Sequence, residues 1–203
     1  MPAPIRRLRM SPDAYHLLPF HPGWKIEYIH GEAVFQPREA FAYGALPVRP
    51  PTSHAPAGVA VHPLDSVDAT ALIELFHDAF SETPEYAGWS DETFAKEPRR
   101  VVHDFLAGKR GAISPASRVA VRDGALVGAA FLVAHDAGAA LLDVLMIAPA
   151  AQRRGLATAL ATAALAHLAA TGGGRLISRW HLANEASVAW HRRQGFIEEP
   201  DFF

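Results

Sequence analysis

The chain has 203 residues, half of them hydrophobic, a formal net charge of −2 and no cysteine. This length and apolar content suffice for one core with an appendage rather than for two full domains. The near-neutral charge provides no field that would gather nucleic acid, and a chain without cysteine has no disulfides, thiolate metal sites or cysteine nucleophile. We expect a cytoplasmic protein with no nucleic-acid partner and no bound metal.

No part of the sequence is apolar over the roughly 18 residues that a membrane-spanning helix requires. The basic start, residues 1–9, leads into Ser11, Pro12 and Asp13 rather than into an apolar run. Neither a signal peptide nor a membrane anchor is therefore expected.

Residues 1–43 are predicted to form an N-terminal extension that consists of a short helix over 12–18 and a β-hairpin over 24–35. His30 and Gly31 supply the two-residue turn of this hairpin. A lone hairpin is marginally stable, so it is expected to pack on the main domain.

Two parts of the extension, residues 11–15 and 23–28, resemble the opening of a family of restriction-endonuclease-fold proteins. The resemblance covers only about thirty residues, and no nuclease core follows it. A nucleic-acid enzyme is thereby one alternative, which the near-neutral charge disfavours. We interpret the extension as structural.

Residues 44–57 are rich in proline and alanine without any period, which predicts a linker. The main domain, residues 58–203, opens with a strand over 59–62. A helix over 65–80 has apolar side chains at helical spacing, and a second, interrupted helical region lies between 81 and 111.

The middle of the domain contains the strongest hairpin signal, with strands over 119–122 and 125–134 joined by an Asp-Gly turn. The nearly continuous apolar run 140–147 is typical of a central strand that is buried on both faces. Asp143 interrupts this run, and a carboxylate in such a place needs a partner or a function.

An Ala- and Leu-rich helix begins after a loop and ends at three consecutive glycines, residues 172–174. A strand over 176–182, a helix over 185–193 and a short strand at 195–197 follow. The alternation of strands and helices predicts an α/β domain with a mixed sheet.

The loop and helix start over residues 152–158 are suited to binding a phosphate, because unpaired N–H groups and the helix dipole favour an anion. The segment lacks the glycine spacing and the Lys-Ser/Thr pair of a nucleotide P-loop. A different phosphate-bearing ligand is therefore indicated.

Two motifs in this half of the chain resemble the GNAT superfamily of N-acetyltransferases. The acetyl-CoA signature of that family, Gln/Arg-x-x-Gly-x-Gly/Ala, stands here as Gln152-Arg153-Arg154-Gly155-Leu156-Ala157. The family's pattern of Asn, a small residue, an aromatic and Gly-Phe recurs as Asn184, Ser187, Trp190-His191 and Gly195-Phe196. The resemblance spans about residues 58–200 and implies a GNAT-like fold, in which helices flank a mixed, mostly antiparallel sheet.

The resemblance implies that the cofactor is acetyl-CoA, with CoA as the product. The pantetheine arm would pair like an added strand where the fourth and fifth strands of the domain splay apart. The diphosphate would rest on amides at the helix start, where Gly155 permits close approach of the backbone. The predicted cofactor-binding residues are Leu145, Met146, Ile147, Gln152, Arg153, Arg154, Gly155, Leu156, Ala157, Thr158 and Asn184.

Two of these assignments have alternatives. The segment around Gly155 could be an ordinary loop before an exposed helix, and Asn184 could cap the following helix instead of contacting a ligand. A backbone N–H near Met146 or Ile147 is expected to polarise the thioester carbonyl.

The implied reaction is transfer of an acetyl group to a primary amine by direct attack on the thioester. A non-catalytic acyl-CoA-binding or regulatory module is the alternative. His191 stands where many family members have a tyrosine that protonates the leaving thiolate. An imidazolium could do the same if burial does not leave it neutral; the alternative is a histidine that merely packs or is solvated.

Two further residues are acid-base candidates. Asp143 is predicted to be the base or a substrate anchor, unless it bonds to backbone or pairs with an arginine such as Arg179. His181 is the second candidate, although a strand histidine is usually structural. The side chains of Trp180 and His181 are expected to point to opposite faces of the sheet.

The acceptor pocket in this family is formed largely by the first two helices and their connection. Acidic and aromatic side chains in that connection suit a cationic amine, and a solvated acidic loop is the alternative. The predicted substrate-binding residues are Glu82, Glu85, Tyr86 and Trp89. A polyamine, an amino acid, an antibiotic, a peptide terminus and a lysine all remain open as acceptors.

The sequence stops at Phe203, seven residues after Phe196, where relatives usually continue into one more strand. An empty strand position would leave an open sheet edge. We expect the hairpin over 24–35 to fill it, either within the chain or by exchange in a homodimer.

Overall fold

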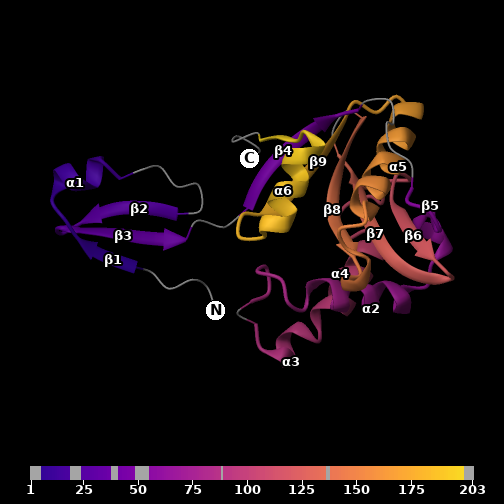
Figure 1. Ribbon diagram of the computed structural model, residues 1–203, viewed down its shortest axis with the longest axis horizontal. Helices are drawn as coiled ribbons and strands as arrows, with labels where there is room; N and C mark the ends of the chain where they lie inside the picture. Colours follow the sequence, from indigo (N-terminus) through magenta and orange to yellow (C-terminus); the bar gives the residue numbers. More distant parts are fainter. Residues whose placement is uncertain are drawn as a thin grey trace.

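The structure is a computed structural model that describes residues 6–18, 24–37, 41–48, 55–87, 89–135 and 138–198. Within these residues, seven strands form one large sheet and three strands form a small one (Figure 1). The strands are β1 (Arg6–Arg9), β2 (Trp24–Ile29), β3 (Glu32–Pro37), β4 (Phe41–Pro47), β5 (Val59–Pro63), β6 (Arg118–Arg122), β7 (Ala125–Ala134), β8 (Ala139–Ile147), β9 (Arg175–His181) and β10 (Ile197–Glu198). The helices are α1 (Pro12–His16), α2 (Ala69–Phe80), α3 (Asp91–Phe94), α4 (Glu97–Leu106), α5 (Leu156–Ala170) and α6 (Glu185–Gln194).

The small sheet contains the predicted hairpin, β2 and β3, together with β1 on the far side of β3. Helix α1 packs against it through Tyr15, whose hydroxyl donates to the Ile26 carbonyl at 3.0 Å and whose ring lies 5.2 Å from that of Tyr28. Figure 1 shows this sheet beside the large one, on the side of β4. The prediction of a helix and a hairpin is confirmed, and β1 is an addition to it.

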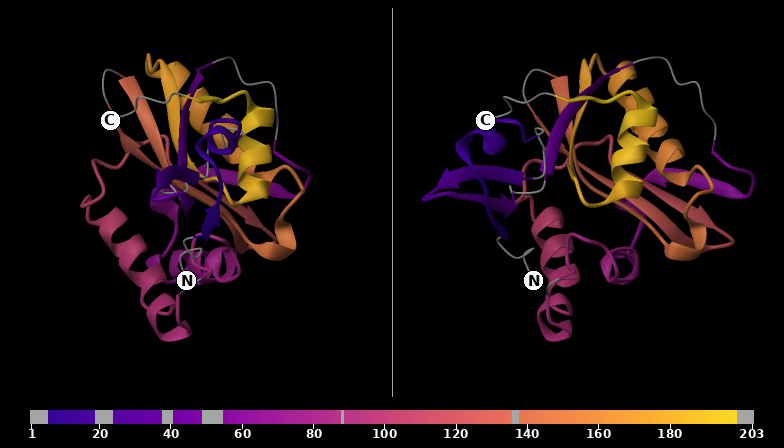
Figure 2. Two further views of the ribbon diagram at one scale, coloured as in Figure 1. Left: turned by 90° about the vertical axis from the view of Figure 1, so that its left-hand side faces the viewer. Right: turned by 60° about the vertical axis from the view of Figure 1, so that its left-hand side comes forward.

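The large sheet has the strand order β10-β4-β9-β8-β7-β6-β5. All neighbours in it are antiparallel except β8 and β9, which run parallel. The mixed, mostly antiparallel sheet flanked by helices is the predicted fold class. Figures 1 and 2 show α5 and α6 on one face of this sheet and α2 and α4 on the other.

One N-terminal strand corrects two of the predictions. The strand that completes the sheet is β4, which pairs along its whole length with β9 and at its middle with β10. The hairpin over 24–35 instead belongs to the small sheet, so the prediction that it fills the edge is wrong. The linker predicted over 44–57 is also wrong at its start, because β4 continues to Pro47; residues 49–54 of it lie outside the described part of the chain, as do residues 199–203.

Two apolar clusters hold the helices to the sheet. Helix α2 buries Leu72, Leu75, Phe76 and Ala79, which confirms its predicted stripe. On the other face, α5 buries a stripe that includes Leu156 and Leu160 against small residues of the sheet. Fully burying one such side chain contributes about 1.5–3 kcal/mol to stability. In the described part of the chain, no helix is long and apolar enough to cross a membrane, and no three potential metal ligands lie together.

Candidate functional site

Strands β8 and β9 separate partway along their length. Their parallel pairing runs from Ala139 opposite Arg175 to Leu142 opposite Ser178 and stops there. Strand β8 continues to Ile147 and β9 to His181 without pairing to each other. The expected splay between the fourth and fifth strands of the main domain is therefore present.

The last residues of β8 direct backbone groups into this opening. The Ala148 N–H donates to the Val127 carbonyl at 3.0 Å, and Ile147 stands opposite Gly128. This pattern makes Ile147 and Gly128 a non-hydrogen-bonded pair, in which the N–H and C=O of each residue point away from the partner strand. Leu145 and Ile147 thus direct their backbone groups away from β7 and into the opening, whereas Met146 directs its own toward β7.

A β-bulge in β8 places Asp143 at the same point. Leu132 pairs with Leu142 and Phe131 with Val144, so Asp143 is an extra residue on β8 without a counterpart on β7. Bulges are frequent next to active sites because they redirect side chains. Here the bulge interrupts the alternation of the strand and places a carboxylate beside the opening.

The start of α5 has the features predicted for a phosphate site. Gly155 is the N-cap, with φ of +80°, and no side chain caps the helix. Residues 152–155 are exposed, and Arg153 also has a positive φ of 55°. The first N–H groups of a helix have no partner within it, so the uncapped amides of α5 are available to an anion.

Two links hold this helix start in place. The Gln152 side chain donates to the Ile147 carbonyl at 3.3 Å, which ties the loop to the end of β8. The Thr158 hydroxyl accepts from Trp190 Nε1 at 3.3 Å and from Gln194 Nε2 at 2.9 Å, which ties α5 to α6. The predicted cofactor residues of β8 and α5 therefore lie on two adjoining elements.

His191 does not meet the condition for a general acid. Its side chain is buried, with Nε2 2.8 Å from Ser178 Oγ and Nδ1 2.8 Å from the Ser187 carbonyl oxygen. The carbonyl can only accept, so Nδ1 carries the proton and Nε2 accepts from the serine. Burial lowers the pKa of His191 from 6.5 to about 4, although the bond to Ser187 opposes this. These contacts fit the alternative of a histidine that packs in the core, where the centre of its ring lies 4.2 Å from that of Trp180.

Both oxygens of Asp143 are engaged by an arginine. Arg110 Nε lies 2.5 Å from Oδ2 and Nη2 lies 2.8 Å from Oδ1, in a bidentate pair that is mostly shielded from solvent. Of the alternatives for Asp143, pairing with an arginine is the one observed, but the partner is Arg110 and not Arg179. A base role would require this pair to open.

His181 and Asn184 lie at the carboxyl end of β9. Trp180 is buried in the cluster with α5 and α6, while His181 is half-buried on the other face and edge-on to Phe41 at 5.0 Å. The prediction of opposite faces is confirmed. Asn184 is the N-cap of α6, accepting from the Ser187 N–H at 3.0 Å, which was the alternative to a cofactor contact.

The predicted acceptor residues occupy the connection between α2 and α3. Glu85 Oε1 accepts from Asn184 Nδ2 at 2.9 Å, so this connection crosses over to the start of α6. Its Oε2 is buried and has no hydrogen-bond partner among the described residues. Glu82 and Trp89 are exposed. Burial, followed by the charges of Glu97 and Glu85, raises the pKa of Tyr86 to about 12, so its phenol is neutral.

The sequence reasoning missed the contribution of β4 to this region. The ladder places Phe41 opposite His181 and Tyr43 opposite Arg179, so β4 adds two aromatic residues beside the end of β9. Neither Phe41 nor Tyr43 is among the predicted site residues. The alternation of Phe41 and Tyr43 with small residues was the available signal for a strand.

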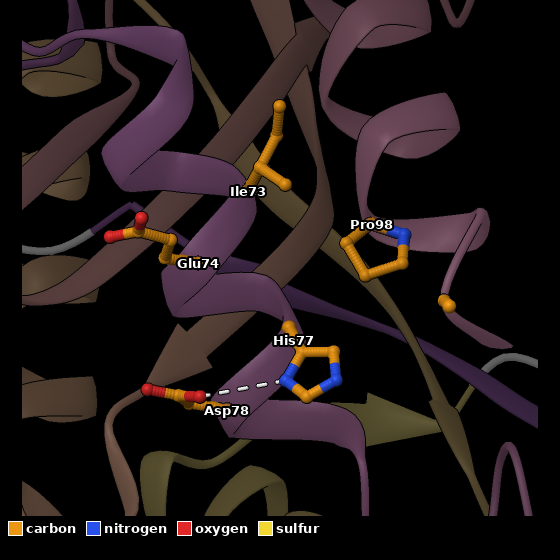
Figure 3. A pocket seen from close by; sticks show the side chains of 6 residues that line it. Ile73, Glu74, His77, Asp78 and Pro98 are labelled. Carbon is orange, nitrogen blue, oxygen red and sulfur yellow. Dashed lines mark ion pairs between the residues drawn. The ribbon is translucent and has the colours of Figure 1, made fainter. Parts of the chain in front are cut away.

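A separate pocket lies between α2 and the start of α4 (Figure 3). In Figure 3 the His77 imidazole points toward Asp78, with Nδ1 3.5 Å from Oδ1. The lining residues are Ile73, Glu74, His77, Asp78, Ala95 and Pro98. None of the predicted site residues is among them, so this pocket is not part of the site.

The fold and the splayed strands define an acyltransferase-like architecture, and comparison with known proteins identifies its family. The model of the acetyltransferase (GNAT) family matches residues 70–196, so the chain belongs to this family. This membership supports an acyl-CoA-dependent transferase activity. None of the comparisons supports the resemblance of the extension to restriction-endonuclease-fold proteins. No match was found among the curated proteins.

Solved structures with the same fold include three acetyltransferases. The PaiA N-acetyltransferase from Thermoplasma acidophilum, in complex with coenzyme A, is 21% identical with a TM-score of 0.59 over 70% of this chain and 91% of that one. A GNAT family acetyltransferase from Brucella melitensis, in complex with acetyl-CoA, is 23% identical with a TM-score of 0.53 over 68% and 82%. A GCN5-related N-acetyltransferase from Sphaerobacter thermophilus is 18% identical with a TM-score of 0.59 over 78% and 48%, so the match spans about half of that protein.

Proposed function

We propose that the protein is an acetyl-CoA-dependent N-acetyltransferase that acts on a primary amine. The observation that supports this most directly is the opening between β8 and β9 beside the uncapped start of α5. Leu145 and Ile147 would offer backbone groups to the pantetheine arm, as an added strand would use them. The amides over residues 153–158 would hold the diphosphate. The absence of cysteine fits a cytoplasmic setting.

The backbone of β8 would also polarise the reacting carbonyl. Of the two predicted N–H donors, Met146 is directed toward β7, whereas Ile147 is directed into the opening. We therefore assign the oxyanion contact to Ile147. A fixed backbone donor is effective because it needs no rearrangement as charge develops on the oxygen.

Glu85 is the residue we assign to the acceptor ammonium. Asn184 fixes one oxygen of its carboxylate, and the other oxygen is buried without a partner among the described residues. A buried oxygen without a donor is costly, and an ammonium would supply the missing donor. The same oxygen would then accept the proton that the amine must lose before it attacks.

The departing group requires no acid from His191. Acetyl-CoA supplies an activated acyl carbon whose leaving group is a thiolate, and a free thiol has a pKa of only about 8.5. Solvent can protonate such a group after it departs. Asp143, paired with Arg110, would act on the shape and charge of the site rather than as the base.

A non-catalytic acyl-CoA-binding module is the second candidate. The observation that favours it is that burial lowers the pKa of His191 and that Asp143 is paired with Arg110, so two of the three predicted catalytic residues are engaged within the fold. The two candidates make the same prediction for CoA binding and opposite predictions for turnover.

Calorimetric titration with CoA and thiol release from acetyl-CoA in the presence of a panel of primary amines test the proposal together. We expect saturable CoA binding and amine-dependent thiol release. Glu85→Gln should lower kcat/KM by about 100-fold, typical of losing a general base, while Glu92→Gln, at an exposed glutamate outside the predicted site, serves as the matched control. CoA binding without turnover on any amine would favour the second candidate, and no CoA binding would refute both.

A further inference from the structure

Strands β4 and β9 carry a group of polar and aromatic side chains on one face. Residues that stand opposite each other in a ladder share a face of the sheet, as do residues two apart along a strand. We call Phe41, Tyr43, Arg179 and His181 the β4–β9 patch. Trp180 packs toward α5 and α6, so the patch lies on the opposite face, where α2 and α4 cover the neighbouring strands.

Arg179 is an unneutralised cation in this patch. Its side chain is exposed, and no carboxylate forms an ion pair with it in the part of the chain that the structure describes. The guanidinium carbon lies 4.6 Å above the centre of the Phe41 ring. Contact with a ring steadies a guanidinium while leaving its N–H donors available for a bidentate anion.

A carboxylate on the neighbouring strand β8 is already paired. Asp143 on β8 uses both oxygens for Arg110, so it does not neutralise Arg179 across the opening. Among the residues that the structure describes, no carboxylate takes up the positive charge of Arg179, which leaves it available to a ligand.

The position of Arg179 connects it with the proposed reaction. Pairing between β8 and β9 ends at Ser178, immediately before Arg179, so this guanidinium stands where the opening begins. Glu85 is bound to Asn184, beyond the other end of the same unpaired stretch. A cationic and an anionic side chain thus flank the carboxyl-terminal part of β9.

We propose that Arg179 binds a carboxylate of the acceptor, so that the acceptor is a small molecule carrying both a primary amine and a carboxylate. This inference rests on the proposed function, in which Glu85 receives the amine. Phe41 positions the guanidinium, which gives the N-terminal strand β4 a part in acceptor selection. Arg179 is a specificity-determining residue in this arrangement and takes no part in bond making.

The test uses acceptors that differ only in the anionic group. Lysine is compared with cadaverine, and tyrosine with tyramine, by thiol release from acetyl-CoA; aminophosphonate analogues of the amino acids form a third arm. The measured quantity is the ratio of kcat/KM for the amino acid to kcat/KM for its decarboxylated partner. Comparing this ratio between variants cancels general losses of activity and differences in amine basicity.

Four proteins are compared: the native chain, Arg179→Ala, Arg179→Lys and Arg175→Ala. We expect Arg179→Ala to lower the ratio about tenfold, as the loss of one charge-assisted contact at an exposed site does. Arg179→Lys should retain part of the preference for the amino acid, because lysine keeps the positive charge but lacks the two parallel N–H donors of a guanidinium. Arg175→Ala also removes a positive charge from β9, but at a position where β9 is still paired with β8. It should therefore leave the ratio as in the native chain.

The inference is overturned if native protein prefers the decarboxylated amines, if Arg175→Ala lowers the ratio as much as Arg179→Ala, or if phosphonates are preferred to carboxylates. In each case transfer to plain amines would leave the proposed function standing. If no amine is acetylated, calorimetric binding of the same pairs in the presence of CoA decides. Equal binding of both members of each pair would then overturn the inference, while the CoA titration judges the proposed function separately.

Discussion

Gly44 of β4 lies directly against the indole of Trp180 on β9. A Cβ atom at Gly44 would stand 2.8 Å from Cη2 of that ring and 2.6 Å from the backbone carbonyl oxygen of Ile197. Both distances are shorter than side chains tolerate, and one neighbour is backbone that cannot rotate away. Strand β4 therefore fits between β9 and β10 because this position has no side chain.

Gly44→Ala is expected to lower the free energy of unfolding by about 1–3 kcal/mol, the usual cost of overpacking. Gly174→Ala is the matched control, because nothing lies within 4 Å of its added Cβ, and it should change stability by less than about 0.5 kcal/mol. Urea denaturation measures both. Equal effects of the two substitutions would contradict the tight fit of β4.

Gly155→Ala is expected to weaken CoA binding about fivefold to tenfold. The φ of +80° at Gly155 costs an alanine about 1 kcal/mol or more, and relaxation of that strain would displace the amides at the start of α5. Gly172→Ala, at a turn with φ of +77° after the opposite end of α5, imposes the same kind of strain. Calorimetric titration should find the CoA affinity of Gly172→Ala close to native; if both variants lost affinity alike, the effect would be general.

Protonation of His191 should destabilise the fold in acid. The pKa of His191 is about 4 in the folded state, against 6.5 for an unperturbed histidine, so the unfolded chain binds the proton more readily. The stabilisation is complete above pH 6.5 and is lost as the pH falls from 6.5 to about 4. At about 1.4 kcal/mol per pKa unit, the total loss is about 3 kcal/mol.

Urea denaturation at pH 7 and pH 5 checks this. His191→Phe, combined with Ser178→Ala to avoid an orphaned hydroxyl, should flatten the fall in stability between the two pH values. The exposed His103→Gln should leave that fall as it is in the native chain. An unaltered slope in the double variant would show that other groups control the acid response.

The pair of Arg110 and Asp143 should behave as a unit. Asp143→Leu alone, or Arg110→Met alone, leaves one partly buried charge without its partner and is expected to cost about 2 kcal/mol of stability. The combined replacement Arg110→Met with Asp143→Leu should recover most of that loss, because neither charge remains. Chemical denaturation of the single and double variants gives the coupling energy; a double variant as unstable as the sum of the two singles would rule out the pairing.

The parts of the fold that the sequence predicts are those with strong local patterns. The stripe of α2, the Asp-Gly hairpin of β6 and β7, and the apolar run of β8 each depend on near neighbours along the chain. Strand β4 has only the short alternation at Phe41 and Tyr43, because Gly44 and Ala45 resemble loop residues; their partners lie on β9 and β10. The place of β4 in the sheet depends on contacts with residues far along the chain, which a short stretch of sequence does not contain.

The same limit applies to the site. The start of α5 is a local motif and was found from its residues. The state of His191 depends on Ser178 in another strand, and the partner of Asp143 had to be chosen among several arginines. Burial and pairing of that kind are properties of the folded chain, so sequence reasoning could state the alternatives without choosing between them.

The place of β4 also sets the order in which the sheet can close during synthesis. A ribosome makes β4 early, but the two strands that flank it, β9 and β10, are among the last elements it makes. Domains fold as their segments emerge. Strand β4 therefore cannot pair within this sheet until residues 175–198 have been synthesised. The nascent chain thus carries a strand without neighbours through most of its translation, a period in which a chaperone or another copy of the chain could occupy it.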